Sequence, residues 1–367
     1  MYRFAVWIAL IPLLILFAAA CEEPPGFQGE GGIFDSPVGV AIHWPYAYVT
    51  NANMDLSGDK DGAITVVDLG IALVRRDICI VNHVSAPPFL SRMVLTSDGA
   101  MGYVGDRRHN SILVYDLTDP EHPQLMDMNP DEEGDQGISV ARQPYGLALT
   151  PDESQLFTAC IGSGDVSLVD LNQGELAKNE DLSWGVTELK IDPLGRFVYV
   201  TNQSLNDITL LDARTGSFVT SFDPENIKTV TGFDNRGIAF TPDGRFAFIA
   251  ARNPGALLMI DTELVPTNPD RAVARRLPTD VGPTAVAVTP NGTEVWVTNF
   301  YTNSVYAIDI ETGNILKRLR VGNGPNDLQF FAEEEFPDHY YALTVNFASH
   351  NVTLLDARSK EVIWAIP

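Results

Sequence analysis

A six-residue segment of alternating apolar side chains, closed by an aspartate, recurs along this chain. Its seven copies end at positions 42 to 54 residues apart, namely Asp68, Asp116, Asp170, Asp212, Asp261, Asp309 and Asp356. Apolar alternation with a period of two indicates a β-strand. A self-similar unit of about this length is one supersecondary unit that buries its apolar surface against neighbouring copies. The repeat therefore predicts one small sheet per copy.

Further strands precede each of these segments. The nearest is rich in aromatic residues, and before it several repeats carry a strand of small apolar residues with a tight turn, Pro-Asp-Gly at 242–244 or Pro-Asn-Gly at 290–292. Large β-formers suit a sheet packed on both faces, and small residues suit a crowded innermost strand. We predict an all-β fold: a seven-bladed β-propeller over residues 37–367, with four-stranded antiparallel blades around a central channel.

The ends of this repeat region predict how the ring closes. Blade one begins with an inner strand near Val38, and blade seven ends with an outer strand at 361–366. Closure would then lack a blade shared between the two ends of the chain, unless residues 31–35 pair with blade seven.

A tetrapeptide also recurs in the aromatic strands. Residues 48–51 and 199–202 both read Tyr-Val-Thr-Asn, and 296–299 differ only by Trp296. Together with the turns and the final aspartates, this resembles the YVTN-type β-propeller family from about Pro37 to Pro367. Blades two, three and seven depart most from the pattern. Because the final aspartate recurs in every blade, we expect it to accept backbone N–H groups in the following turn rather than to do acid–base chemistry.

The N-terminal segment has the order of a secretory signal. Arg3 precedes an apolar run that ends at Ala20, and three alanines stand before Cys21, which resembles the lipobox of bacterial lipoproteins. We predict a signal peptide over 1–20, lipidation of Cys21 with palmitate among its acyl chains, and a flexible tether over 21–36. The alternative is an uncleaved membrane anchor. Both the lipoprotein and the membrane-anchor interpretation place the propeller outside the cytoplasm, in the cell envelope. The sequence leaves open whether it lies on the periplasmic face or at the outer membrane.

Charge and cysteines limit the partners. The chain holds 24 Lys and Arg against 48 Asp and Glu, so we expect no nucleic-acid partner, and we expect a monomer. Cys79 and Cys160 fall in blades one and three, which are not neighbours. We therefore predict two unpaired thiols.

Metal and cofactor signals are weak. One segment resembles a calcium-binding loop, because it places the oxygen-bearing side chains of Ser57, Asp59 and Asp61 at alternate positions. An acidic, solvated hairpin is the favoured interpretation of this segment. The acidic stretch 127–135 is interpreted as a solvated insertion. The sequence has no Cys-x-x-Cys-His for covalent haem and no close histidine pair among its six histidines, so we expect no metal and no cofactor.

The binding surface is predicted at the mouth of the channel. Loops between the second and third strands converge there with loops that lead into each inner strand. They gather a polar and aromatic rim, with ordinary turn residues as the alternative interpretation: Arg107, Arg108, His109, Tyr145, Trp184, Arg236, Arg252, Asn299, Tyr301, Asn346 and His350.

Two functions remain open. The favoured one is a non-catalytic extracytoplasmic scaffold whose rim binds a protein or a small polar ligand. The alternative is an enzyme, either a propeller hydrolase of the lactonase type or a quinoprotein-like enzyme, with active residues on the same rim.

Overall fold

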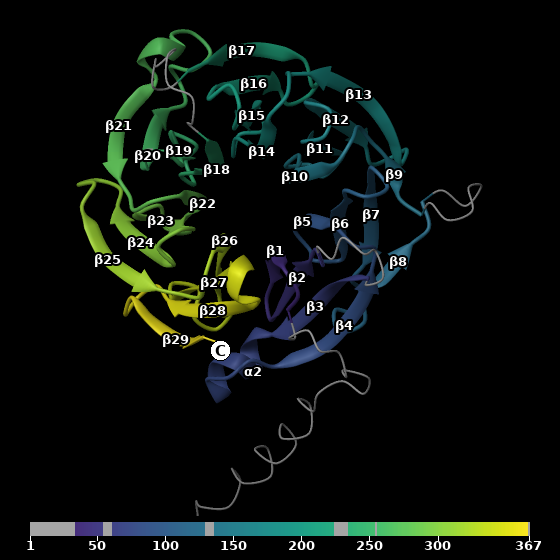
Figure 1. Cartoon of the computed structure of the whole chain (residues 1–367), viewed down its shortest axis with the longest axis vertical. Coiled ribbons are helices and arrows are strands. Elements are labelled where there is room, and N and C mark those ends of the chain that lie inside the picture. Colours follow the sequence, from purple (N-terminus) through teal and green to yellow (C-terminus); the bar gives the residue numbers. More distant parts are fainter. Residues whose placement is uncertain (1–33, 54–60, 129–135, 224–233, 254, 366–367) are drawn as a thin grey trace, which may run out of the picture.

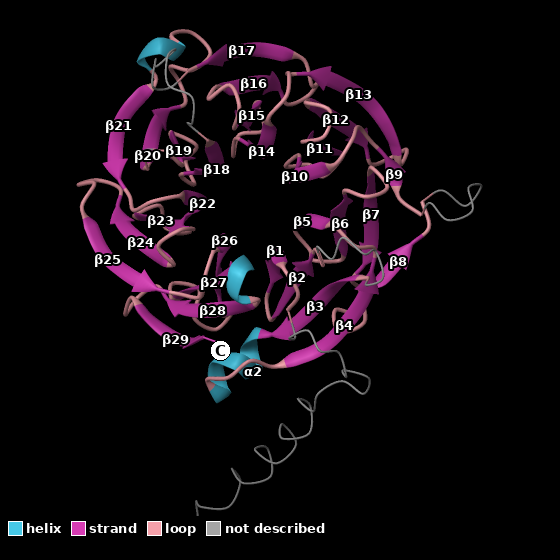
Figure 2. Ribbon diagram, viewed as in Figure 1, coloured by secondary structure: helices cyan, strands magenta, loops and turns pink. Residues whose placement is uncertain are grey.

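The chain forms a ring of small sheets in the computed structural model, which describes residues 34–53, 61–128, 136–223, 234–253 and 255–365. Figure 1 shows the sheets arranged around a central opening, and Figure 2 shows that strands make up nearly all of the regular structure. The described part contains seven sheets, six of four strands and one of five. The predicted seven-bladed β-propeller is confirmed.

Each blade is built from consecutive antiparallel strands. Blade one comprises β1 (Pro37–His43), β2 (Tyr46–Asn51), β3 (Gly62–Asp68) and β4 (Ile80–Ala86). Blade two comprises β5 (Leu90–Leu95), β6 (Met101–Asp106), β7 (Ser111–Asp116) and β8 (Gln124–Met126), and the short strand β9 (Ile138–Ser139) also pairs with β7. Blade three comprises β10 (Pro144–Leu149), β11 (Gln155–Cys160), β12 (Asp165–Asp170) and β13 (Glu175–Asp181). Blades four and five comprise β14 (Val186–Ile191), β15 (Phe197–Asn202), β16 (Ile208–Asp212) and β17 (Phe218–Phe222); and β18 (Asn235–Phe240), β19 (Phe246–Ala251), β20 (Ala256–Asp261) and β21 (Val273–Pro278). Blades six and seven comprise β22 (Pro283–Val288), β23 (Glu294–Asn299), β24 (Ser304–Asp309) and β25 (Ile315–Arg320); and β26 (Pro325–Ala332), β27 (Tyr340–Asn346), β28 (Asn351–Asp356) and β29 (Glu361–Ala365).

The final aspartate of the third strand has the predicted structural role in every blade. Asp116 Oδ1 accepts the backbone N–H of Thr118, and the other six aspartates accept equivalent bonds in the turns that follow them. In blade one the same contact caps the short helix α2 (Leu69–Arg75), where Asp68 Oδ1 accepts the N–H of Ile71.

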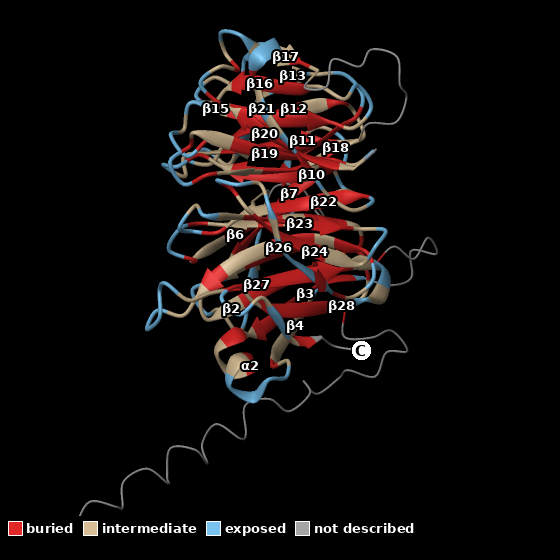
Figure 3. Ribbon diagram, turned by 90° about the vertical axis from the view of Figure 1, so that its left-hand side faces the viewer, coloured by how far each residue is buried: buried red, intermediate tan, exposed pale blue. Residues whose placement is uncertain are grey.

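The core lies between blades. Figure 3 shows buried residues along the strands and exposed residues in the turns. The first residue of the recurring tetrapeptide explains why that position is aromatic: Tyr48, Tyr199 and Trp296 are at most 1% exposed. Tyr48 packs in a cluster with Leu90 and other side chains of blade two, so one large ring joins neighbouring sheets.

The ring closes where blade seven meets blade one. Each of these two blades takes all four strands from its own stretch of chain, as predicted, and the described residues show no exchanged strand. Instead, Asp327 Oδ2 accepts the N–H of Val40 at 3.0 Å, and Asn326 Nδ2 donates to the carbonyl of Val38 at 3.1 Å. Phe34, 1% exposed, packs with Leu343 and other residues of blades one and seven.

Residues 34–36 of the predicted tether are therefore seated on the propeller. Like Phe34, Ser36 is buried, with 7% of its surface exposed. The backbone N–H of Ser36 donates to His350 Nδ1 at 2.9 Å. The signal peptide and Cys21 lie outside the described residues. Within the described ranges, no helix is both long and apolar enough to cross a bilayer.

The prediction of two unpaired thiols is half wrong. Cys160 is a free, buried cysteine. Cys79 is disulfide-bonded. Cys79 and Cys160 are not bridged to each other, as their places in blades one and three predicted, but Cys79 has another partner.

Candidate functional site

The inner strands share one register position that faces the centre of the ring. It is the third residue of each strand: Gly39, Arg92, Gly146, Glu188, Gly237, Ala285 and Asp327. The pairing with the second strand shifts at this position in every blade, through a bulge or similar irregularity. Four small residues and three charged ones therefore occupy one level of the channel.

The glycines are required by crowding at this level. A Cβ placed on Gly39 would lie 3.2 Å from the Cα of Arg92, and one on Gly146 would lie 3.0 Å from the Cα of Glu188. Both distances are tighter than ordinary van der Waals contact. Each glycine thus lets the next inner strand come close enough to place its own long side chain in the channel.

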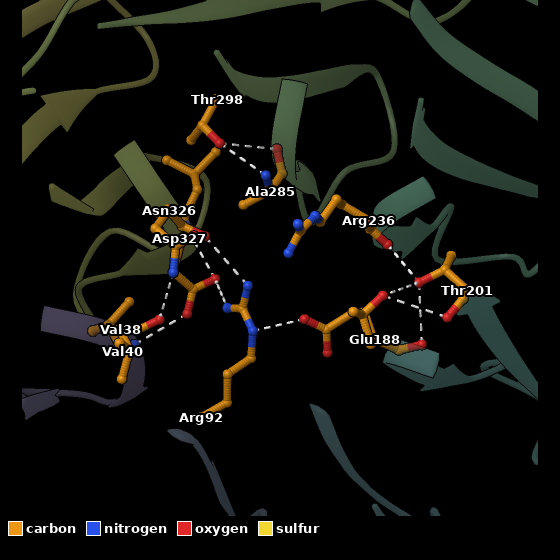
Figure 4. Close-up of polar contacts among 12 residues, drawn as sticks. Val38, Val40, Arg92, Glu188, Thr201, Arg236, Ala285, Thr298, Asn326 and Asp327 are labelled. Carbon is orange, nitrogen blue, oxygen red and sulfur yellow. Dashed lines mark hydrogen bonds and ion pairs between the residues drawn. The ribbon is translucent and has the colours of Figure 1, made fainter. Parts of the chain in front are cut away.

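Arg92 joins three blades at this level. Its Nε lies 2.6 Å from Glu188 Oε2, its Nη1 lies 2.5 Å from Asp327 Oδ1, and its Nη2 donates to the carbonyl of Asn326 at 3.2 Å. Figure 4 shows the guanidinium between the two carboxylates. Burial alone would lower the pKa of Arg92, but Asp327 and Glu188 outweigh it and raise that pKa above its ordinary value. Arg92 is therefore a permanent buried cation.

A cavity of about 360 Å³ lies along the inner strands at this level. The ionic triad of Arg92, Glu188 and Asp327 lines it, together with Lys190, Gln329 and apolar side chains of β18, β22 and β26. This volume is in the range of small-molecule sites. We call the face where inner strands begin the top face and the opposite one the bottom face.

Blade five carries the best-connected part of the predicted rim on the top face. Arg236 Nε lies 2.7 Å from Asp234 Oδ1, and Arg252 Nη1 lies 3.3 Å from Asp234 Oδ2, so two arginines share one carboxylate. The Arg252 guanidinium also lies 4.8 Å from the ring centroid of Tyr301 in blade six, a cation–π contact.

A second rim pair lies in blades two and three. The Arg107 guanidinium is 5.8 Å from the ring centroid of Tyr145, and burial lowers the pKa of Arg107. Arg108 and His109 are exposed, and His109 Nδ1 lies 2.7 Å from Asp106 Oδ2. These residues gather at one sector of the ring, apart from the pairs of blade five.

The remaining rim residues divide into exposed and structural side chains. Trp184 and Tyr301 are 64% and 62% exposed. Asn299 and Asn346 are fully buried and bond within their own neighbourhood, for example from Asn346 Nδ2 to Thr353 Oγ1 at 2.9 Å. His350 holds the segment before β1 through the N–H of Ser36. A ligand-binding role for the rim residues stays a prediction.

The calcium candidate is only partly visible. Ser57 and Asp59 lie outside the described residues. Asp61 Oδ2 accepts a long hydrogen bond from Ser85 Oγ, at 3.4 Å. Among the described residues, no group of three or more His, Cys, Asp or Glu is placed to hold a metal ion.

Sequence reasoning missed the ionic triad. The signal was present, because an alignment of the inner strands by their turn and tetrapeptide places Arg92, Glu188 and Asp327 at the position that is small in the other blades. A charged residue on a strand otherwise made of small apolar residues marks a departure that the fold must accommodate by pairing.

Comparisons with known proteins agree on the fold. No protein-family model matches this chain. It is 22% identical over 213 residues to hydrazine synthase subunit beta of Kuenenia stuttgartiensis, a match that covers 46% of this chain and 55% of that protein. The match thus spans little more than half of the curated relative. A chain of the solved Kuenenia stuttgartiensis hydrazine synthase aligns with a TM-score of 0.69 and 16% identity, covering 92% of this chain and 99% of that one.

Proposed function

We propose that this protein is a non-catalytic, extracytoplasmic binding module that holds a protein partner on the top face of blades four to six. The proposal includes export by the predicted N-terminal signal and the relation to YVTN-type propellers. The observation that carries it is a set of exposed apolar side chains and partly buried arginines on this face, which we call the top arc: Trp184, Leu205, Arg236, Arg252, Val281 and Tyr301.

The apolar part of the top arc is exposed in loops that contact one another. Besides Trp184 and Tyr301, Leu205 and Val281 are 52% and 55% exposed. In blade four, the N–H of Gln203 donates to the carbonyl of Gly185, next to Trp184, at 2.8 Å. Exposed tryptophan and tyrosine beside arginine are the residue types that dominate protein-binding hot spots.

Blade five connects the two apolar ends of the top arc. Asn235 Nδ2 donates to the carbonyl of Asn206 in the blade-four loop at 2.7 Å. On the other side, Arg252 lies over the ring of Tyr301. The loops of three blades therefore form one supported surface rather than separate tips.

The charge of the top arc indicates an acidic contact on the partner. Arg236 and Arg252 share the carboxylate of Asp234, so these three residues carry one positive charge in excess, while Asp280 adds a carboxylate beside Val281. A partner that presents a carboxylate to the two arginines, among apolar side chains, fits this cluster.

The curated relative supports a protein partner. Its name describes a subunit, that is, a chain that works within an assembly. The likeness of the whole propeller ring to a chain of that enzyme is compatible with a similar use of the fold here.

Site-specific photo-crosslinking in cells that produce the full chain tests the proposal. A photoreactive amino acid is placed at Trp184 or Tyr301, and at Leu194 or Phe336 as controls, which are 61% and 56% exposed in bottom-face turns. We expect the two top positions to capture the same protein and the two control positions not to capture it. Equal capture at all four positions, or no captured protein at the top, would contradict the proposal.

A further inference from the structure

We propose that Arg107 and Tyr145 form a carboxylate-binding site on the top face, between blades two and three. The site lies in a different sector of the ring from the top arc and does not depend on it. It rests on an arginine that has no counter-charge, on a second arginine at the same position of the repeat that has one, and on terminal amino groups that a ligand can reach.

Arg107 is a half-buried cation without an anion among the described residues. Its guanidinium carbon lies 5.8 Å from the ring centroid of Tyr145, and its side chain has no hydrogen bond and no ion pair within the described ranges. Burial lowers the pKa of Arg107. For Arg92, in contrast, two carboxylates outweigh the effect of burial and raise the pKa. A desolvated charge is costly without a partner, so an anion bound to Arg107 would be stabilised there.

The repeat supplies an internal comparison with Arg252. Arg107 directly follows β6 in blade two, as Arg252 directly follows β19 in blade five. The N–H of Arg107 donates to the carbonyl of Phe89, just before the inner strand, at 3.3 Å. The N–H of Arg252 donates in the same way to the carbonyl of Asp234 at 3.0 Å, and the Asp234 carboxylate lies 3.3 Å from Arg252 Nη1. Blade two therefore has the same backbone arrangement, but Phe89 stands where blade five supplies the carboxylate.

The terminal amino groups of Arg107 are the part of the side chain that a ligand can reach. Nε is buried and closed to a ligand, whereas Nη1 and Nη2 keep accessible surface. The terminal amino groups of a guanidinium match the two oxygens of a carboxylate, which is why such pairs are often bidentate. The ring of Tyr145 lies against the guanidinium and limits its orientation. Arg107 therefore offers a supported pair of donors.

The surroundings limit the ligand to one negative charge. The neighbouring ionic triad carries one negative charge in excess, and its Arg92 also lies 6.0 Å from the ring centroid of Tyr145. Asp106, directly before Arg107, adds a buried carboxylate that pairs with His109. A doubly charged anion such as phosphate would be repelled by these groups more strongly than a carboxylate. The ligand is therefore a carboxylate, either of a free organic acid or of an acidic side chain on a protein.

Protection from phenylglyoxal, a reagent that modifies guanidinium groups, tests the site on the full-length protein. Sodium acetate is the probe, and sodium chloride at equal ionic strength is the reference. Peptide mapping by mass spectrometry compares Arg107 with Arg142, an exposed arginine in the loop before β10. We expect acetate to slow the labelling of Arg107 at least about threefold and to leave that of Arg142 unchanged, because a bound carboxylate covers the amino groups. An equal effect of acetate on both arginines, or no labelling of Arg107 in either salt, would overturn the proposal.

A matched pair of variants at Phe89 tests whether acetate acts at Arg107. Phe89→Asp places a carboxylate where blade five has Asp234, and Phe89→Asn has the same shape without the charge. Both residue types tolerate the left-handed backbone at this position, where φ is 63°. We expect acetate to protect Arg107 in Phe89→Asn but not in Phe89→Asp, whose own carboxylate occupies the site. Equal protection in the two variants, both checked as folded by circular dichroism, would overturn the assignment. The result with the parent protein stands even if a variant fails to fold.

The same pair of variants identifies the source of the carboxylate. If an acidic side chain of the top-arc partner fills the site, recovery of that partner with Phe89→Asp falls at least about tenfold below its recovery with Phe89→Asn. Equal recovery assigns the site to a free organic acid. Failure of the top arc to capture any partner contradicts the proposed function alone, because acetate protection is measured on the isolated protein.

Discussion

Arg92 in blade two and Asp327 in blade seven form an ion pair past blade one, with 2.5 Å between Nη1 and Oδ1. The second carboxylate oxygen of Asp327 accepts the N–H of Val40 in blade one. One side chain thus links the first two blades to the last. In a ring without an exchanged strand among its described residues, this link supports the seam where the repeat begins and ends.

Removal of Arg92 should destabilise the ring strongly. In Arg92→Met, the carboxylates of Glu188 and Asp327 remain buried and lose their common cation, which typically costs about 3 to 5 kcal/mol of unfolding free energy. Urea denaturation followed by tryptophan fluorescence measures the loss. The control is Arg214→Met in an exposed turn, which should change stability by less than about 0.5 kcal/mol. A loss in Arg92→Met no larger than in the control would show that the triad does not support the fold.

The seam should open locally when Asp327 is shortened. Asp327→Ala removes the acceptor of the Val40 N–H and one partner of Arg92. We expect faster hydrogen exchange in β1 and β26, while β18, which contributes no residue to the ionic triad, keeps its protection. Hydrogen-exchange mass spectrometry of the variant and the parent measures both. Uniformly faster exchange in all blades would instead indicate a global loss of stability.

The strand-end aspartates should make the fold sensitive to acid. A hydrogen bond from the Thr215 hydroxyl lowers the pKa of Asp212, and one from Thr312 does the same for Asp309. Because the folded pKa lies below the unfolded value of about 3.9, this stabilisation is complete above that value and is lost as pH falls through the folded pKa.

The double variant Asp212→Asn/Asp309→Asn tests this. Asparagine can still accept the turn hydrogen bonds but does not titrate. We expect a smaller loss of unfolding free energy between pH 6 and pH 3 than in the parent, measured by urea denaturation at each pH. Glu175→Gln/Glu311→Gln, both exposed, is the control. An identical pH dependence in the aspartate variant and the parent would refute the assignment.

Cys160 should be an inert thiol in the folded protein. Burial raises its pKa to about 11, so almost none of it is thiolate at pH 8. We expect iodoacetamide to label Cys160 slowly in buffer and rapidly in urea, with peptide mapping to identify the site. Fast labelling of Cys160 without denaturant would show that this part of blade three opens readily.

The fold was predictable from sequence because its information is local and repeated. The aromatic residue type at Tyr48, Tyr199 and Trp296 predicts a buried strand. The aspartate that ends each repeat predicts a turn. Every blade therefore gives the same prediction again. The positions of the first and last strands also predicted a seam without a shared blade, and they left open a pairing of residues 31–35, of which 31–33 lie outside the described residues.

The centre of the ring was not predictable in the same way. Arg92, Glu188 and Asp327 lie in three different blades, and their contact arises only when the ring closes. The rim prediction named loop residues by topology alone, so it could not separate buried Asn299 and Asn346 from exposed Trp184 and Tyr301. The bridge of Cys79 did not follow from the sequence because the positions of the blades exclude only Cys160 as its partner.

Quantitative co-purification tests the binding function most directly. The full chain is isolated from the producing cells as the parent, as Trp184→Ala/Tyr301→Ala, and as Leu194→Ala/Phe336→Ala, and the protein captured by crosslinking is quantified by mass spectrometry. Truncation of two hot-spot aromatics costs about 2 kcal/mol or more each, so we expect at least about a tenfold loss of partner in the top-arc variant and no loss in the bottom-face variant. Equal recovery of the partner with all three proteins would contradict a binding role for the top arc.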